Sequence, residues 1–108
     1  MSFWLLLISA IIMEVCGTTC MKLSEGFTRL IPSVLIWVFY GVSFASLTFA
    51  LKGINLGVAY AIWAGVGTAL VAVIGIFFFK EPATALKLVS LGLVIIGVAG
   101  LYFSEVSY

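Results

Sequence analysis

Glu14 is the residue of this chain best suited to chemistry, because it stands alone inside a long apolar segment. The run MSFWLLLISAIIM precedes it and VCGTTCM follows it. A charged side chain at the centre of a bilayer costs about 2.5 to 3.5 kcal/mol even on lenient insertion scales. Low-dielectric surroundings favour the neutral carboxyl, so Glu14 can hold a proton that an arriving cation displaces. Its position therefore predicts a proton and cation site.

The period of a helix places small side chains beside this carboxyl group. Residues three, four and seven positions away share its face, and they are Leu7, Ala10, Ile11, Gly17, Thr18 and Met21. A structural alternative is a small-residue contact between helices, with Glu14 hydrogen-bonded across it. The functional interpretation is favoured, because an ionisable group is an expensive way to join two helices inside a membrane.

Aromatic residues at helical spacing form the second set of candidates. Tyr60 and Trp63 share a face well inside an apolar segment, beyond the reach of an interfacial aromatic belt. A ring face there can contact an organic cation, and Tyr60 adds a hydroxyl group. Another face carries Trp37, Tyr40, Ser43, Phe44 and Leu47. For its first two members, ligand contact and plain packing both remain open.

Apolar segments must position these residues. The 108-residue chain is 65% hydrophobic and 8% charged, with a mean hydropathy of +1.37, whereas soluble domains carry about 25% charged residues. Four spans are each long enough to cross about 30 Å of hydrocarbon, approximately residues 3–21, 30–51, 57–79 and 85–103. The short loops make neighbouring helices antiparallel. We expect an all-α integral membrane protein, a single four-transmembrane-helix bundle over residues 1–108.

A signal peptide is the alternative interpretation of the first span. No Lys or Arg precedes the apolar run, and no clear small-residue cleavage pattern follows it. A mature transmembrane helix is therefore expected over residues 3–21.

The composition also argues against several classes of function. The chain has no histidine and two cysteines, Cys16 and Cys20, which removes most metal sites and nucleophile–base pairs. A net charge of +1 supplies no basic patch for nucleic acid. We therefore expect no enzyme activity, no metal or other cofactor, and no nucleic acid partner.

Small residues in the last two spans suggest motion and assembly. Gly65 and Gly67 in WAGVGTAL allow either a hinge between two conformers or plain close packing. Ser90 and Gly97 lie seven positions apart on one stripe, which suits helix association. They are candidate dimer contacts.

The strings EVCGTTCMKLSEGFTRL and AYAIWAGVG, together with the four-helix layout, resemble the small multidrug resistance family over essentially the whole chain. The resemblance implies a proton-coupled antiporter that exports hydrophobic or quaternary ammonium cations. It also implies an antiparallel dimer in a bacterial inner membrane, with Glu14 as the proton- and substrate-coupling carboxylate and Gly97 as a dimer contact. Ser90 stands where a glycine is common, so the contact there is expected to be looser. The implied substrate-binding residues are Leu7, Ala10, Ile11, Gly17, Thr18, Tyr40, Ser43, Phe44, Tyr60 and Trp63.

The sequence leaves alternatives open for the branch of the family and for the class of function. The guanidinium-exporting branch of the family usually carries a bulky Trp after EV, whereas this chain reads EVCGTT with Gly17 and so resembles the broad-specificity branch. Polyamine-exporting members share an approach to the third span like LKGINLGVAYA. A non-transporting membrane subunit, with Glu14 paired to a basic residue of a larger partner, is a different class. A cation channel has less support, because one carboxylate per chain gives little for continuous conduction.

The expected partners are a small organic cation, protons, the lipid bilayer and a second chain. Four helices scarcely enclose a cavity, whereas two chains bring two Glu14 carboxyls together. Loops one and three carry four basic residues with their flanks and the other side carries one, which places those loops in the cytoplasm. The residues are Lys22, Arg29, Lys80 and Lys87 against Lys52. This bias leaves a heterodimer with an oppositely oriented paralogue as the alternative to a homodimer.

Overall fold

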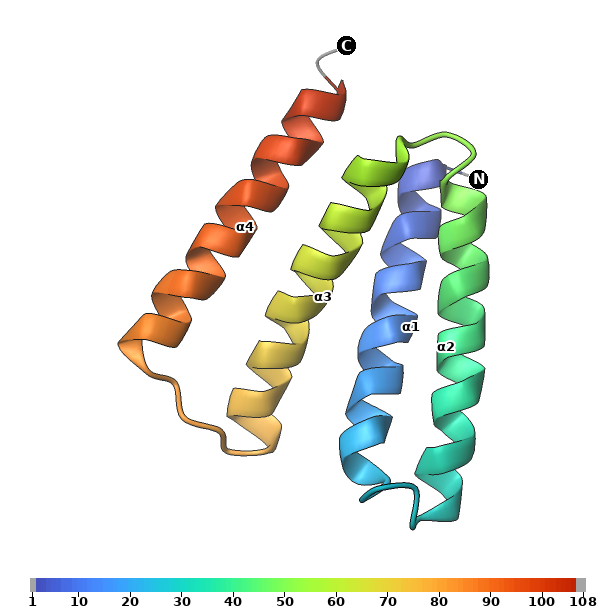
Figure 1. The fold of residues 1–108 in the computed structure, drawn as a ribbon, viewed down its shortest axis with the longest axis vertical. Coiled ribbons are helices and arrows are strands. Elements are labelled where there is room, and N and C mark those ends of the chain that lie inside the picture. Colours follow the sequence, from blue (N-terminus) through green and yellow to red (C-terminus); the bar gives the residue numbers. More distant parts are fainter. Residues whose placement is uncertain (1, 107–108) are drawn as a thin grey trace. The chain divides into compact units, whose positions relative to one another are not determined.

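The computed structural model describes the backbone of residues 2–106 and the side chains of residues 2–104, which fold into four α-helices (Figure 1). All four are long and apolar enough to cross a membrane. The prediction of an all-α membrane protein with four spanning helices is confirmed; the largest difference in bounds lies at the end of the last helix. The helices are α1 (Phe3–Leu23), α2 (Leu30–Ala50), α3 (Leu56–Phe78) and α4 (Ala85–Val106).

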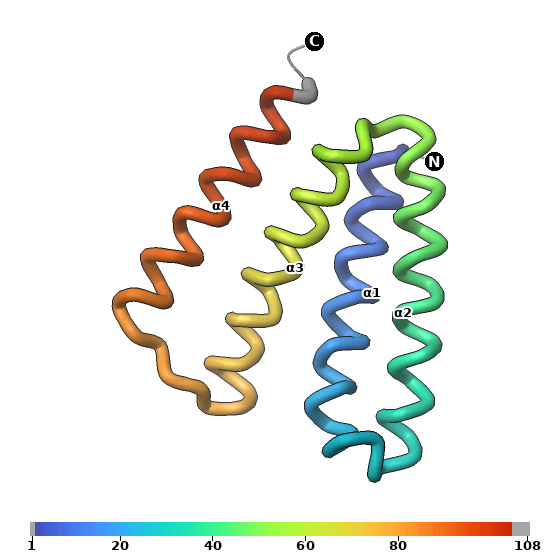
Figure 2. The backbone as a smooth tube through the Cα atoms, viewed as in Figure 1, coloured from blue at the N-terminus to red at the C-terminus, as the bar shows by residue number. Residues whose placement is uncertain are grey.

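The helices form two units, one ending at Ile54 and the other beginning at Asn55. In the first unit α1 packs against α2, and in the second α3 packs against α4. Figure 2 shows that a short connection joins the two antiparallel helices of each unit. The grouping of all four helices into one domain stays a prediction.

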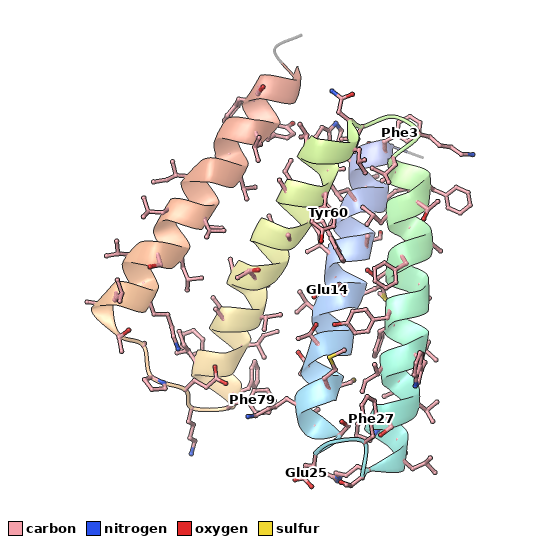
Figure 3. All side chains as sticks on the ribbon, in the orientation of Figure 1. Phe3, Glu14, Glu25, Phe27, Tyr60 and Phe79 are labelled. Atoms are coloured by element: carbon pink, nitrogen blue, oxygen red, sulfur yellow. The ribbon has the colours of Figure 1, made fainter. Side chains whose placement is uncertain are left out.

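A tight turn joins α1 to α2 and sets which residues of the two helices meet. Ser24 is almost fully buried; its hydroxyl donates to the carbonyl of Met21 at 2.8 Å and accepts from the backbone N–H of Phe27 at 3.2 Å. Glu25, Gly26 and Phe27 all have positive φ, so the chain reverses within these residues. The turn lies at the end of the first unit opposite Phe3 (Figure 3).

Small side chains dominate the buried positions, while large apolar side chains point outward. Ala10, Ala50 and Ala59 are fully buried, which lets helix backbones approach closely. Many large apolar residues are exposed, among them Leu5, Ile8, Ile12, Phe77, Leu86, Leu93 and Ile96. Such an apolar surface would favour aggregation in water. In a bilayer it is the surface that meets the lipid chains.

Close packing also joins the helices of the second unit. A Cβ atom added to Gly65 on α3 would lie 2.5 Å from Cγ2 of Val98 and 3.4 Å from Cγ1 of Val94 on α4. Gly65 is therefore a contact point at which α4 approaches the backbone of α3. At the start of α4, the side chain of Thr84 accepts a 3.1 Å hydrogen bond from the backbone N–H of Lys87 and caps the helix.

Candidate functional site

The carboxyl group of Glu14 lies about halfway along α1 (Figure 3). Its Oε1 accepts a hydrogen bond of 3.0 Å from the hydroxyl of Thr18, which follows one helical turn later. Its Oε2 is buried and has no hydrogen-bond partner among the residues that the structure describes. The two oxygens of one carboxyl group therefore differ: one accepts a hydrogen bond from the protein, and the other is buried without a partner among the described residues.

Tyr40 extends this hydrogen-bonded pair onto the neighbouring helix. Its hydroxyl on α2 lies 2.5 Å from the hydroxyl of Thr18 and 3.8 Å from the sulfur of Met21. A chain of polar groups thus runs from Glu14 through Thr18 and Tyr40 to Met21. Because the Thr18 hydroxyl gives its one hydrogen to Glu14, Tyr40 is the donor in the bond between Tyr40 and Thr18.

Gly17 provides the surface on which the Tyr40 ring rests. A Cβ atom at Gly17 would lie 2.8 Å from Cδ2 and from Cε2 of that ring, and 3.4 Å from Cβ of Phe39. Real side chains do not approach so closely, so only glycine fits this arrangement without a shift. The ring of Tyr40 in turn packs against Phe44, with centroids 5.9 Å apart and an interplanar angle of 35°.

Ser43 faces α1 but does not bond to Glu14. Its hydroxyl donates a 2.6 Å hydrogen bond to the backbone carbonyl of Ala10, and both residues are fully buried. Leu7 and Ile11 are buried on the same helix as Ala10. These predicted substrate-binding residues therefore take part in the interior of the fold, whereas Phe44 is half exposed.

In the second unit, Tyr60 and Trp63 form an aromatic pair on α3. Their centroids are 5.4 Å apart with an interplanar angle of 63°, an edge-to-face arrangement. Tyr60 is 56% exposed, so its ring has a free surface in this chain. The predicted pairing of these two aromatics on one face is present.

The remaining predicted residues lie elsewhere in the second unit. Gly65 contacts α4, and Gly67 is buried. Ser90 and Gly97 are exposed on α4, and a Cβ atom at Gly97 would meet no atom within 4 Å among the described residues. Space is therefore present at Gly97 for another helix.

The structure groups several predicted residues and adds two that the sequence analysis did not assign to the site. Thr18 bonds to Oε1 of Glu14, Tyr40 bonds to Thr18, and Gly17 lies against the Tyr40 ring. The additions are Met21, which ends the polar chain, and Phe39, which also borders Gly17. Met21 shares the Glu14 face by helical period, but its contact with Tyr40 depends on the register of α2 against α1.

The arrangement suits exchange of a proton and an organic cation. A buried carboxyl oxygen without a donor is unfavourable unless it is protonated or paired with a cation. Over the described residues there is no group of three or more His, Cys, Asp or Glu side chains that could hold a metal ion.

Comparisons with known proteins agree on one family. The model of the small multidrug resistance protein family matches residues 2–94. The chain is 50% identical over 102 residues to the Bacillus subtilis "uncharacterized membrane protein YvaE", covering 94% of this chain and 86% of that protein. It is 44% identical over 99 residues to the quaternary ammonium compound-resistance protein QacF of Klebsiella aerogenes, covering 92% and 90%.

A third relative is the multidrug resistance protein EbrB of Bacillus licheniformis, 48% identical over 92 residues, which cover 85% of this chain and 77% of that protein. With four helices suited to cross a membrane and bacterial membrane relatives, the chain is a multi-pass inner membrane protein. The match over residues 2–94 and these identities show that it belongs to the small multidrug resistance family, whose members are membrane transporters.

Proposed function

We propose that this chain is a proton-coupled antiporter that exports hydrophobic or quaternary ammonium cations. The observation that carries the proposal is the unequal surroundings of the Glu14 carboxyl group. Oε1 accepts from Thr18, whereas Oε2 is buried without a partner among the described residues. A proton and a cation compete for that second oxygen.

This competition leads to antiport if the site can switch from one side of the membrane to the other only while a proton or a cation is bound. If either a proton or a cation must neutralise Glu14 before the site opens to the other side of the membrane, each passage of one species is tied to the return of the other. The proton gradient then drives export of the cation.

The expected substrate is an aromatic or quaternary cation. The Tyr60 and Trp63 pair offers ring faces and edges, and a desolvated cation is attracted to such faces. The names of two relatives, a quaternary ammonium compound-resistance protein and a multidrug resistance protein, support the same class. We propose that these rings contact the substrate.

Contact between Gly17 and Tyr40 argues against guanidinium export. Members of the guanidinium-exporting branch usually carry a bulky Trp after EV, whereas even a Cβ atom at Gly17 would lie 2.8 Å from the Tyr40 ring. A tryptophan would not fit this arrangement. Polyamine export remains the alternative within the family.

A dimer completes the proposal. The exposed Ser90 and Gly97 on α4 leave room for a second chain, and small residues allow helices to approach closely in a membrane. Two chains bring two Glu14 carboxyl groups to one substrate, so their titrations are expected to be coupled.

Replacing Glu14 with Gln tests the coupling. In proteoliposomes with an imposed pH gradient, the wild-type chain is expected to move ethidium, a fluorescent quaternary cation, against its concentration gradient, and the Glu14→Gln variant is expected not to. Glu25→Gln is the matched control, because it removes an exposed carboxylate from the turn of the same unit. Uphill transport retained by the Glu14→Gln variant would overturn the proposal.

Binding by the purified chain separates this function from that of a non-transporting subunit. A transporter should bind ethidium by itself, more weakly as protons compete at low pH. A subunit whose Glu14 pairs with a basic residue of a partner would show no binding at any pH.

A further inference from the structure

We propose that Gly17 is a positioning residue. By seating the ring of Tyr40, it holds the Tyr40 hydroxyl against Thr18, keeps Thr18 on Oε1 of Glu14, and leaves Oε2 as the oxygen at which proton and cation exchange. This inference rests on the proposed function, and it gives Gly17 a role other than lining the substrate site.

The first step is the packing of the Tyr40 ring against Gly17. The Tyr40 ring covers the Cα of Gly17, and a Cβ there would lie 2.8 Å from two ring carbons. Phe39 borders the same glycine at 3.4 Å from that Cβ position and limits the room for adjustment. An alanine at position 17 must therefore displace the ring away from α1.

The second step is the position of the hydroxyl. With the ring seated, the Tyr40 hydroxyl lies 2.5 Å from the Thr18 hydroxyl, and Thr18 donates to Glu14 at 3.0 Å. When Tyr40 donates to Thr18, the only hydrogen of the Thr18 hydroxyl is directed to the carboxylate. Displacing the ring removes this constraint and frees Thr18 to rotate.

The third step is the effect on exchange. A hydrogen bond donated to a carboxylate favours its ionised form. Loss of an ordered Thr18 donor should therefore favour protonation of Glu14, and protons should displace a bound cation at a higher pH than in the wild-type chain.

Few other titratable groups face this carboxyl within the first unit. Tyr40 is the titratable side chain that α2 brings to it, and α1 itself carries Cys16, Cys20 and Lys22 at other positions along the helix. Glu14 takes part in no ion pair within the described part of the chain. The path through Thr18 is thus the main polar link between Glu14 and its own unit.

The experiment measures ethidium binding to the purified full chain as a function of pH. Gly17→Ala and Tyr40→Phe should each raise the pH of half-maximal binding, by up to about one unit, which is a tenfold change in proton competition. In a Thr18→Val background, Gly17→Ala should cause no further shift, because the link to Glu14 is already absent.

Gly41→Ala is the matched control, since a Cβ at this glycine of α2 would meet no described atom within 4 Å; it should leave the profile unchanged. The inference would be overturned if Gly17→Ala lowered the affinity at high pH without moving the pH of half-maximal binding. It would also be overturned if Gly17→Ala shifted that pH further in the Thr18→Val background. If Gly17→Ala fails to fold, an unchanged pH of half-maximal binding in Tyr40→Phe would overturn the inference. If ethidium binding to the wild-type chain did not change with pH, the proposed function itself would be overturned.

Discussion

The hydroxyl of Ser43 on α2 donates a 2.6 Å hydrogen bond to the backbone carbonyl of Ala10 on α1. Both residues are completely buried, and the small side chain of Ala10 lets α2 come close enough for this contact. The Thr18 and Tyr40 hydroxyls form a second polar contact further along the same pair of helices. Two side-chain bonds therefore fix the register of α1 against α2 around Glu14.

Removing the first bond should loosen this register. We expect Ser43→Ala to lower the free energy of unfolding by about 0.6 kcal/mol, and at most about 1.7 kcal/mol, as for other hydrogen bonds between membrane helices. Unfolding by denaturing detergent, followed by circular dichroism, measures the change. Ser46→Ala is the control on the same helix, because Ser46 is half-buried and its hydroxyl makes no hydrogen bond in the described part of the chain. An equal loss in both variants would show that the bond to Ala10 contributes nothing specific.

Much of the fold follows from the sequence because lipid imposes a simple rule. Every backbone polar group in a bilayer needs a partner within the protein, so a long apolar run must be a helix, and the charge-free stretches at residues 30–51 and 57–79 left no other choice. The same periodicity placed Gly17 and Thr18 beside Glu14. These relationships lie within single helices, where spacing alone decides which residues are neighbours.

Contacts between helices are harder to predict from the sequence. Tyr40 and Ser43 share a face in the sequence, yet one bonds to Thr18 and the other to the Ala10 carbonyl. Which partner each meets depends on the offset of α2 against α1, to which the turn with positive φ at Glu25, Gly26 and Phe27 contributes. Helical period carries no information about such an offset.

Trp63 is expected to contact the substrate directly. Trp63→Ala should weaken binding of ethidium by about 1 to 2 kcal/mol, the value of a desolvated contact between a cation and a ring, which corresponds to about five- to thirtyfold in Kd. Fluorescence titration at high pH measures the affinity where competition from protons is weakest. Phe77→Ala is the control, because Phe77 lies fourteen residues further along the same helix α3 and is not a candidate substrate-binding residue; its loss should leave Kd unchanged. Unchanged affinity in Trp63→Ala would assign that residue to packing.

Gly65 is expected to be intolerant of a side chain. The Cβ of an alanine would lie 2.5 Å from Cγ2 of Val98, so Gly65→Ala should lower the free energy of unfolding by about 1 to 3 kcal/mol through overpacking. Val98→Ala in the same chain removes the clashing methyl groups and should restore much of the loss. Gly92→Ala is the control, since a Cβ there would meet no described atom within 4 Å.

The same variants test the predicted hinge. If Gly65 and Gly67 allow α3 to bend between two conformers, Gly65→Ala should slow ethidium transport even in the Val98→Ala background, where packing is relieved, while binding stays intact. Stopped-flow transport and equilibrium titration of the same preparations separate the two effects. Normal transport rates in the relieved double variant would leave Gly65 as a packing residue alone.

The distribution of basic residues predicts how the chain enters the membrane. Four of its five Lys and Arg residues flank loops one and three, so these loops should lie in the cytoplasm, and both termini on the opposite side. Reporter enzymes fused to the C-terminus, one active only in the cytoplasm and one only outside it, measure the fraction in each orientation. Strong bias towards one reporter would favour an oppositely oriented paralogue as the partner. Equal activity of the two reporters would contradict the charge argument and support an antiparallel homodimer. Replacing Lys52, the single basic residue on the other side, with Gln should increase the bias.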